Sequence, residues 1–70
     1  MTARENDVAE YVNAIRDNTL HILNQKPEKG QIASILKQRI VALGMGNTSD
    51  QLLVDIASCM IAYKLMLKKK

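Results

Sequence analysis

QLLVDIASCMIAYKLML, residues 51–67, is the stretch that decides the fold. Apolar side chains recur in it at intervals of three and four, which is the period of an α-helix. Between Leu52 and Tyr63 the only charged residue is Asp55, and the only other polar residue is Ser58. A helix that is apolar on nearly all sides is buried on more than one of them. We therefore expect residues 49–67 to form a helix that other helices cover on several sides.

Two further helices are predicted before this stretch. Apolar residues with the helical spacing predict the first over about residues 5–24, and they are Val8, Tyr11, Val12, Ile15, Ile22 and Leu23. A second set predicts a helix over about residues 29–43, and it contains Ile32, Ile35, Leu36, Ile40 and Leu43. Pro27 separates the two helices, because the residue before a proline avoids helical geometry. The expected fold is all-α, with one domain over residues 1–70 and three helices in each protomer.

The break between the second and third helices reads GMGNTSD, residues 44–50. Gly44 directly follows the last periodic residue, where a left-handed residue commonly closes a helix. We expect Thr48 to be the N-cap of the last helix, with Gln51 three residues later completing a capping box. Asp50 suits the first turn, because the positive end of the helix dipole favours negative charge.

The length of the chain predicts self-association. A chain of 70 residues buries only about 60% of the surface of its unfolded form, so its core alone is marginal. Disulfides, a structural metal or oligomerisation usually supply the missing stability. Cys59 is the only cysteine and His21 the only histidine, too few for an intrachain disulfide or a closed zinc site. Oligomerisation is left, and we predict a helical homodimer.

The last helix carries two apolar stripes. The first is sufficient to pack on the other two helices and contains Leu52, Leu53, Ile56, Cys59, Met60, Tyr63, Met66 and Leu67. The second contains Val54, Ala57, Ile61 and Leu65, beside the small Ser58. A two-fold dimer is the commonest way to bury a self-complementary patch that two short helices cannot surround. The predicted dimer or partner interface contains Leu53, Val54, Ala57, Met60, Ile61 and Leu65. Two alternatives stay open: the second stripe binds a different protein, or it is an ordinary small-residue face that needs little cover.

No pattern in the sequence predicts catalysis. Cys59 has no basic or histidine neighbour within a turn, so we expect a buried and inert thiol. His21 lies one turn after Asp17, and the two can hydrogen bond on the helix surface. The segment Gly44-Met45-Gly46 lacks the preceding strand and the Gly-Lys-Ser/Thr ending of a phosphate loop. We expect a protein that is not an enzyme and has no metal, no cofactor and no small-molecule substrate.

The net charge of +3 is unevenly distributed, since residues 1–28 carry −2 and residues 29–70 carry +5. Basic residues of the second part are candidates for contact with nucleic-acid phosphates, and they are Lys29, Lys37, Arg39, Lys64, Lys68 and Lys69. The last two helices could imitate a helix-turn-helix, but the last presents Leu, Ile, Ala and Met where base reading needs polar side chains. Phosphate-dominated DNA binding therefore stays an alternative, and a solvated lysine tail is the other.

The order of features from about Thr19 to Met66 resembles the AriR/YmgB family of small biofilm and acid-resistance regulators. The corresponding text is TLHILNQKPEKGQIASILKQRIVAL, then GMGNTSD, then QLLVDIASCMIAYKLML. The resemblance rests on pattern and length over about two thirds of the chain. It implies a three-helix protomer, a homodimer, and control of transcription or signalling through protein contact, with some DNA affinity. It implies no catalytic residues.

We predict a small dimeric helical regulator, bacterial or phage, that acts by protein–protein binding as a connector or modulator. The alternatives are a DNA-binding regulator with a basic patch and a structural assembly subunit. We expect a cytoplasmic location, because residues 2–10, TARENDVAE, are mixed and acidic, unlike a secretory signal. No membrane partner is expected, since no stretch approaches the roughly 20 apolar residues that span a bilayer.

Overall fold

The computed structural model of the protein describes residues 3–68, and the side chains of residues 7–68. Its three α-helices are α1 (Ala3–Asn24), α2 (Lys29–Gly44) and α3 (Asp50–Lys68), and no strand occurs within residues 3–68. The prediction of an all-α fold with three helices is confirmed. Every predicted helix end lies within two residues of the observed one.

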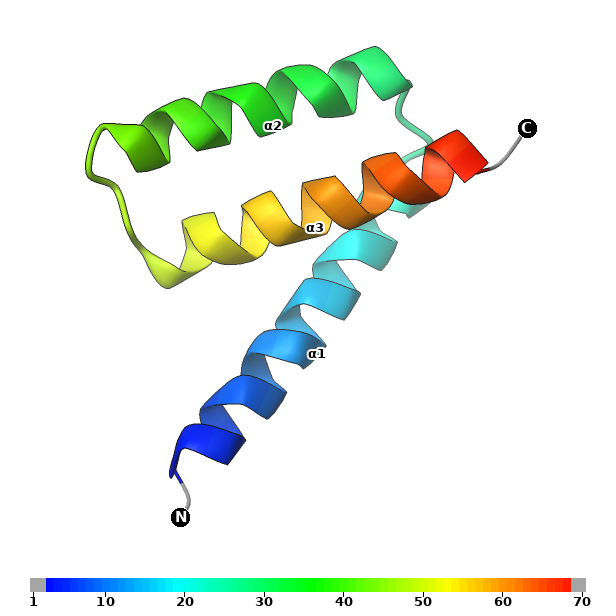
Figure 1. The fold of residues 1–70 in the computed structure, drawn as a ribbon. Helices are drawn as coiled ribbons and strands as arrows, with labels where there is room; N and C mark the ends of the chain where they lie inside the picture. Colours follow the sequence, from blue (N-terminus) through cyan, green and yellow to red (C-terminus); the bar gives the residue numbers. More distant parts are fainter. Residues whose placement is uncertain (1–2, 69–70) are drawn as a thin grey trace.

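The helix α3 lies in the middle of the molecule (Figure 1). The helix α2 runs antiparallel alongside it, and α1 crosses it on the other side. Both helices pack on α3, whereas the backbones of α1 and α2 do not approach each other closely within residues 3–68. The first half of α1 extends away from the other two helices. The arrangement is therefore open: α1 and α2 both pack on α3, and their backbones do not pack on each other.

Backbone geometry ends α1 just before Pro27. Lys26 adopts a positive φ of 51°, and the N–H of Lys26 donates to the carbonyl of Leu23 at 3.0 Å. The helix α2 then begins after Glu28, whose N–H donates to Oε1 of Gln31 at 2.9 Å. This bond occupies the N–H of the residue before the helix, as the second half of a capping box does. Pro27 itself lies between the helices and belongs to neither.

The end of α2 differs from the prediction. Gly46, with a φ of 103°, is the left-handed residue, and Gly44 is still helical. The N–H of Gly46 donates to the carbonyl of Leu43 at 3.0 Å, and the N–H of Asn47 donates to that of Ala42 at 3.1 Å. These two bonds define a Schellman motif. The prediction for Gly44 is wrong because the helix continues one residue further and closes two residues later.

The N-cap of α3 is also one residue later than predicted. Oγ of Ser49 accepts a hydrogen bond from the N–H of Leu52 at 3.3 Å. Thr48 makes no such bond, so its prediction as the cap is wrong. Gln51 does not complete a capping box, because its side chain donates to Asp55 instead.

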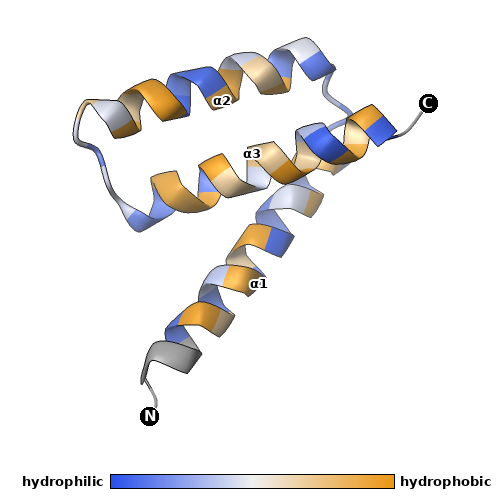
Figure 2. Cartoon of the chain, in the orientation of Figure 1, coloured by the Kyte–Doolittle hydropathy of each residue, from blue (hydrophilic) through white to orange (hydrophobic). Residues whose placement is uncertain are grey.

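The core of the protein is small. Its centre consists of Ile32 from α2 with Cys59 and Ala62 from α3, and half-buried residues pack around them: Ile22, Leu23, Leu36, Tyr63 and Met66. Leu52 and Val54 are buried nearer the start of α3. Among the side chains of residues 7–68, these five hydrophobic residues are buried, whereas twelve large hydrophobic side chains are more than one third exposed. Figure 2 shows apolar residues on all three helices, including the part of α1 that extends away.

The molecule exposes more surface than a compact folded monomer of the same mass. Its accessible surface is 5373 Å², whereas a folded monomer of 7.8 kDa exposes about 4400 Å². Its radius of gyration is 13.1 Å, against about 11 Å for a compact domain of this length. The difference in area, about 1000 Å², is similar to the roughly 800 Å² that one partner contributes to a standard protein interface. The open arrangement of the helices therefore exposes about 1000 Å² more than a compact monomer of this mass.

Small residues let α1 approach α3 closely. Ser58 and Ala62, both completely buried, lie on the inner side of α3. Oγ of Ser58 donates to the carbonyl of Val54 at 2.7 Å and lies 3.3 Å from the carbonyl oxygen of Ile15 in α1. This contact places the crossing of the two helices near Ile15, so the turns of α1 before it extend beyond the crossing.

Within residues 3–68 no helix has the length and apolarity needed to cross a membrane.

Candidate binding surfaces

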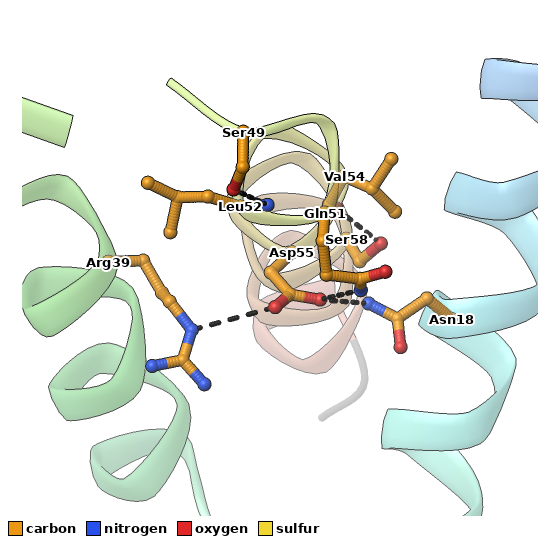
Figure 3. Close-up of polar contacts among 8 residues, drawn as sticks. All are labelled: Asn18, Arg39, Ser49, Gln51, Leu52, Val54, Asp55 and Ser58. Carbon is orange, nitrogen blue, oxygen red and sulfur yellow. Dashed lines mark hydrogen bonds and ion pairs between the residues drawn. The ribbon is translucent and has the colours of Figure 1, made fainter. Parts of the chain in front are cut away.

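One carboxylate holds the three helices in their relative positions. Oδ1 of Asp55 in α3 accepts hydrogen bonds from Nδ2 of Asn18 in α1, at 3.0 Å, and from Nε2 of Gln51, at 3.1 Å. Oδ2 of Asp55 lies 3.7 Å from Nε of Arg39 in α2 (Figure 3). The side chain of Asp55 is 25% exposed and that of Arg39 is 41% exposed. We call these four residues the polar junction. It links α3 to both of the other helices.

The polar junction was not predicted from the sequence. Asp55 stood out as the only charge in an apolar stretch, but its spacing to Asn18 and Arg39 carries no signal. These partners are 37 and 16 residues away along the chain, and only the packing of the helices brings them together. A lone carboxylate in an apolar helix was the one available hint.

The predicted interface residues differ in how far their side chains are exposed. Val54 is only 8% exposed, and it points toward α1, where it lines a depression with Tyr11 and Asn18. Its assignment to an intermolecular interface is therefore corrected: Val54 belongs to the contact between α1 and α3. Ala57 is half-buried. The other four are accessible, with exposed fractions of 39% for Leu53, 55% for Met60, 42% for Ile61 and 43% for Leu65.

The first open surface, here called the α2–α3 face, lies opposite the polar junction. On α2 it contains Ile40 and Val41, which are 49% and 53% exposed. Both line an apolar depression of about 340 Å³ together with Tyr63 of α3. On α3 the face continues along Leu53, Met60 and Leu67, which are seven residues apart and therefore lie on one line of the helix. The predicted Leu53 and Met60 belong to this surface, and the sequence did not indicate that Ile40 and Val41 join them.

The second open surface lies at the end of the molecule where α1 ends, α2 begins and α3 ends. A groove of about 850 Å³ is lined there by Leu23, Lys26, Pro27, Glu28, Lys29, Leu65, Met66 and Lys68. We call it the lysine-rimmed groove, since it combines four apolar residues with three lysines and a single acid. Leu65, a predicted interface residue, is part of its wall, and Ile61 lies one turn earlier on the same line of α3. This groove was not predicted, because its residues come from three separate segments.

The third open surface is the N-terminal arm, residues 7–12 of α1. Val8 and Val12 are 61% and 57% exposed although they continue the apolar stripe that packs on α3 further along. Asp7 and Glu10 are exposed on the same arm. A hydrogen bond to the Asp50 carboxylate, with smaller contributions from burial and from nearby negative charge, raises the pKa of Tyr11. Glu10 and Tyr11 line a depression with Asp50, so this side of the arm faces the start of α3 while the two valines stay exposed.

The basic residues predicted to contact nucleic acid do not share one surface. Arg39 is used within the chain by Asp55. Lys29 and Lys68 lie in the lysine-rimmed groove, whereas Lys37 borders the α2–α3 face. Lys64 is exposed on α3, and Lys69 lies outside the described residues. The structure therefore does not bring the predicted set together.

Cys59 and His21, the two side chains considered for catalysis, lie in surroundings that indicate structural roles. Cys59 is a free thiol, 4% exposed, and burial followed by the negative charge of Asp55 raises its pKa, which Arg39 lowers by a smaller amount. His21 has Nε2 at 3.0 Å from the amide nitrogen of Gln25, rather than a bond to Asp17. Asp17 lies 3.7 Å from Arg16 instead. No group of three potential metal ligands occurs in the part of the chain that the structure describes.

Comparison with known proteins adds no relative: no family model matches the chain, and neither a curated protein nor a solved structure matches it. The resemblance to the AriR/YmgB family stays a prediction. The three open surfaces are therefore the observations from which function has to be inferred.

Proposed function

We propose that the protein is a small helical regulator that works as a homodimer and acts by binding another protein. The observation that carries the proposal is the extent of apolar surface left open on a chain with so small a core. Monomeric soluble proteins rarely leave large contiguous apolar patches uncovered, and such patches mark interaction sites. In this protein the apolar surfaces lie on different sides of α3, so one partner cannot cover them all.

The α2–α3 face is the surface that we assign to the partner protein. Ile40, Val41 and Met60 are each about half exposed, and Tyr63 lies between the helices within the same face. Aromatic residues and methionine are enriched at protein interfaces, and charged residues are depleted at their centres. Lys37 is the charged residue at the border of the apolar depression. This composition resembles the centre and rim of a protein-binding site more closely than a nucleic-acid site.

A DNA-binding function has less support. Phosphate binding requires several basic side chains that can reach one backbone. Here Arg39 is engaged by Asp55, and the accessible lysines are divided between surfaces.

A cytoplasmic location is part of the proposal, since the only cysteine is a buried thiol without a disulfide partner.

The test compares the wild type with an Ile40→Glu/Met60→Glu variant, which places two charges in the α2–α3 face. The matched control is Asn13→Glu/Gln38→Glu, which places the same charges on exposed positions of α1 and α2 that do not line the depression of this face. Immobilised proteins are exposed to bacterial extract, and any retained protein is purified and titrated against all three. We expect the affinity of the face variant to fall by at least about tenfold, or about 1.4 kcal/mol, with the control unchanged.

The mass of the pure protein is measured by sedimentation in the same study. We expect twice the chain mass of 7.8 kDa for the wild type and for both variants. A monomer would contradict the dimer. If every retained protein bound the face variant as well as it bound the control, the assignment of the α2–α3 face would be wrong.

A further inference from the structure

The lysine-rimmed groove contains positive charge that the protein does not use internally. Its three lysines, Lys26, Lys29 and Lys68, are exposed, and none of them forms an ion pair among the side chains of residues 7–68. Arg16 and Arg39, in contrast, each lie 3.7 Å from a carboxylate oxygen. The charge of these lysines is therefore available to another molecule.

The ends of the helices do not account for all of this charge. Lys26 follows the C-terminal end of α1 and Lys68 ends α3, positions where the negative end of a helix attracts a cation. Lys29 is the first residue of α2, and a cation is unfavourable at that positive end. The same positive end offsets the charge of Glu28, which is the N-cap of α2 and the single acid of the groove. The groove therefore has a net positive potential, which favours an anionic occupant.

The backbone conformation of Lys26 is a second observation at the same place. Lys26, with a φ of 51°, is the only residue other than glycine that has a positive φ in the part of the chain that the structure describes. A side chain is strained in this conformation, whereas glycine adopts it readily. Strained residues cluster at ligand-binding sites. The fold alone would favour glycine at this position, so the presence of a lysine indicates a role in binding.

The wall of the groove is apolar and open to solvent. Leu65 is 43% exposed, and Leu23, Pro27 and Met66 are half-buried. An acyl chain needs a pocket that encloses most of its surface. A peptide segment can cover an open wall from one side and keep its own outer side in water, as helices in apolar grooves do. The open wall therefore fits a peptide better than a lipid.

We propose that the lysine-rimmed groove binds an acidic amphipathic segment of a partner protein. The apolar side chains of the segment lie against Leu65 and Met66, and its carboxylates face Lys26, Lys29 and Lys68. Charge complementarity of this kind selects the partner and fixes its register. The inference goes beyond the proposed function, because the groove shares no residue with the α2–α3 face.

The probe for the test is a synthetic helical peptide of about 15 residues, with leucines at helical spacing along one side and glutamates beside them. Fluorescence anisotropy measures its affinity for the full chain at about 150 mM salt, where distant charges are screened. The groove variant is Lys26→Glu/Lys29→Glu. Its matched control is Lys37→Glu/Lys64→Glu, which changes two exposed lysines outside the groove and has the same net charge. We expect the dissociation constant to rise at least about tenfold for the groove variant and less than about threefold for the control.

The apolar wall and the strained lysine are tested separately. Leu65→Gln should weaken peptide binding about fivefold, whereas Leu67→Gln, at a similarly exposed leucine that does not line the groove, should leave it unchanged. Lys26→Gly should weaken binding at least about threefold although its Tm is no lower than that of the wild type. A lower Tm with unchanged binding would show instead that Lys26 serves the fold.

The outcomes separate this inference from the proposed function. Absence of peptide binding by the wild type would overturn it, and so would equal affinities of the groove variant and its control. A peptide with lysines in place of the glutamates should not bind, and equal binding of this peptide would contradict recognition by charge. If oleate or vesicles of phosphatidylglycerol bound and the peptide did not, the occupant would be a lipid. The Ile40→Glu/Met60→Glu variant should bind the peptide like the wild type, so failure at the groove would leave the α2–α3 face in place.

Discussion

Replacement of Asp55 by alanine should weaken the attachment of α1 and α2 to α3 and lower the free energy of unfolding. The substitution removes the acceptor of the hydrogen bonds from Asn18 and Gln51, and it removes the anion opposite Arg39. The side chains that remain are partly buried and keep donors without an acceptor. The polar junction is the only direct side-chain link from α3 to both α1 and α2 among the hydrogen bonds and ion pairs of the described residues.

The magnitude follows from the exposure of each contact. A hydrogen bond to a charged group contributes about 1.5–3 kcal/mol when it is buried, and an exposed ion pair contributes about 0.2–1 kcal/mol. Asp55 is 25% exposed and Arg39 41% exposed, so solvent weakens both kinds of contact. We expect a loss of about 2 kcal/mol in the free energy of unfolding. For a domain of this length, a loss of that size lowers Tm by roughly 8–16 °C.

Thermal and urea unfolding followed by circular dichroism measure the loss, at one protein concentration because a dimer is stabilised by mass action. Asp17→Ala is the matched control, since Asp17 has the same helix propensity change but only an exposed ion pair, with side chains 67% and 73% exposed. We expect Asp17→Ala to change stability by less than about 0.5 kcal/mol. A double-mutant cycle between Asp55→Ala and Asn18→Ala should give a coupling above about 0.5 kcal/mol. Equal losses for Asp55→Ala and Asp17→Ala would refute the role of the polar junction.

Four further predictions concern the helix ends and the thiol. Gly46→Ala should destabilise the protein by about 1 kcal/mol in urea unfolding, because a φ of 103° is strained for a residue with a side chain. A steric clash does not contribute, since nothing lies within 4 Å of the added Cβ. Gly44→Ala is the control and should be neutral or stabilising, because Gly44 is helical. Ser49→Ala should cost about 1 kcal/mol, and Thr48→Ala should cost much less, because the Ser49 hydroxyl accepts the N–H of Leu52. Burial raises the pKa of Cys59 above 9.0, so iodoacetamide should modify the native thiol at least about tenfold more slowly at pH 8 than the urea-unfolded chain. The same shift means that the unfolded chain releases this proton first, so stability should fall as the pH rises through 9.0, and Cys59→Ala should remove that dependence.

Local patterns determine the parts of the fold that could be predicted. Each helix has its own apolar spacing, and Pro27 and the GMGNTSD segment interrupt it, so helix number and boundaries were accessible from the sequence. The caps were each displaced by one or two residues. Either Thr48 or Ser49 can cap a helix, and either Gly44 or Gly46 can adopt a positive φ, so composition does not distinguish them. The hydrogen bonds of the folded loop make the choice.

The candidate surfaces were predicted less completely, because they depend on how the helices pack. A helical wheel of α3 shows two apolar stripes, but it does not show that α1 covers Val54 and leaves Ile61 open. The lysine-rimmed groove combines Leu23, Lys29 and Leu65, which no spacing connects. The most informative residue in the sequence was one whose role had no local signal, the lone carboxylate of Asp55.

The carboxylate of Asp55 lies in a hollow between the helices. In a closed three-helix bundle, each helix contacts both others and the shared interior is apolar. Here α1 and α2 diverge, and the hollow between them contains Asp55, Asn18 and Arg39 as well as Ile32 and Cys59. The larger apolar residues of the arm and several of those of α3 lie on the outer sides of the helices, away from this hollow. Exposed apolar faces are unfavourable for an isolated chain in water and favourable for one whose outer faces are covered by other chains. The proposed assembly therefore rests on these exposed apolar faces as well as on the small size of the core.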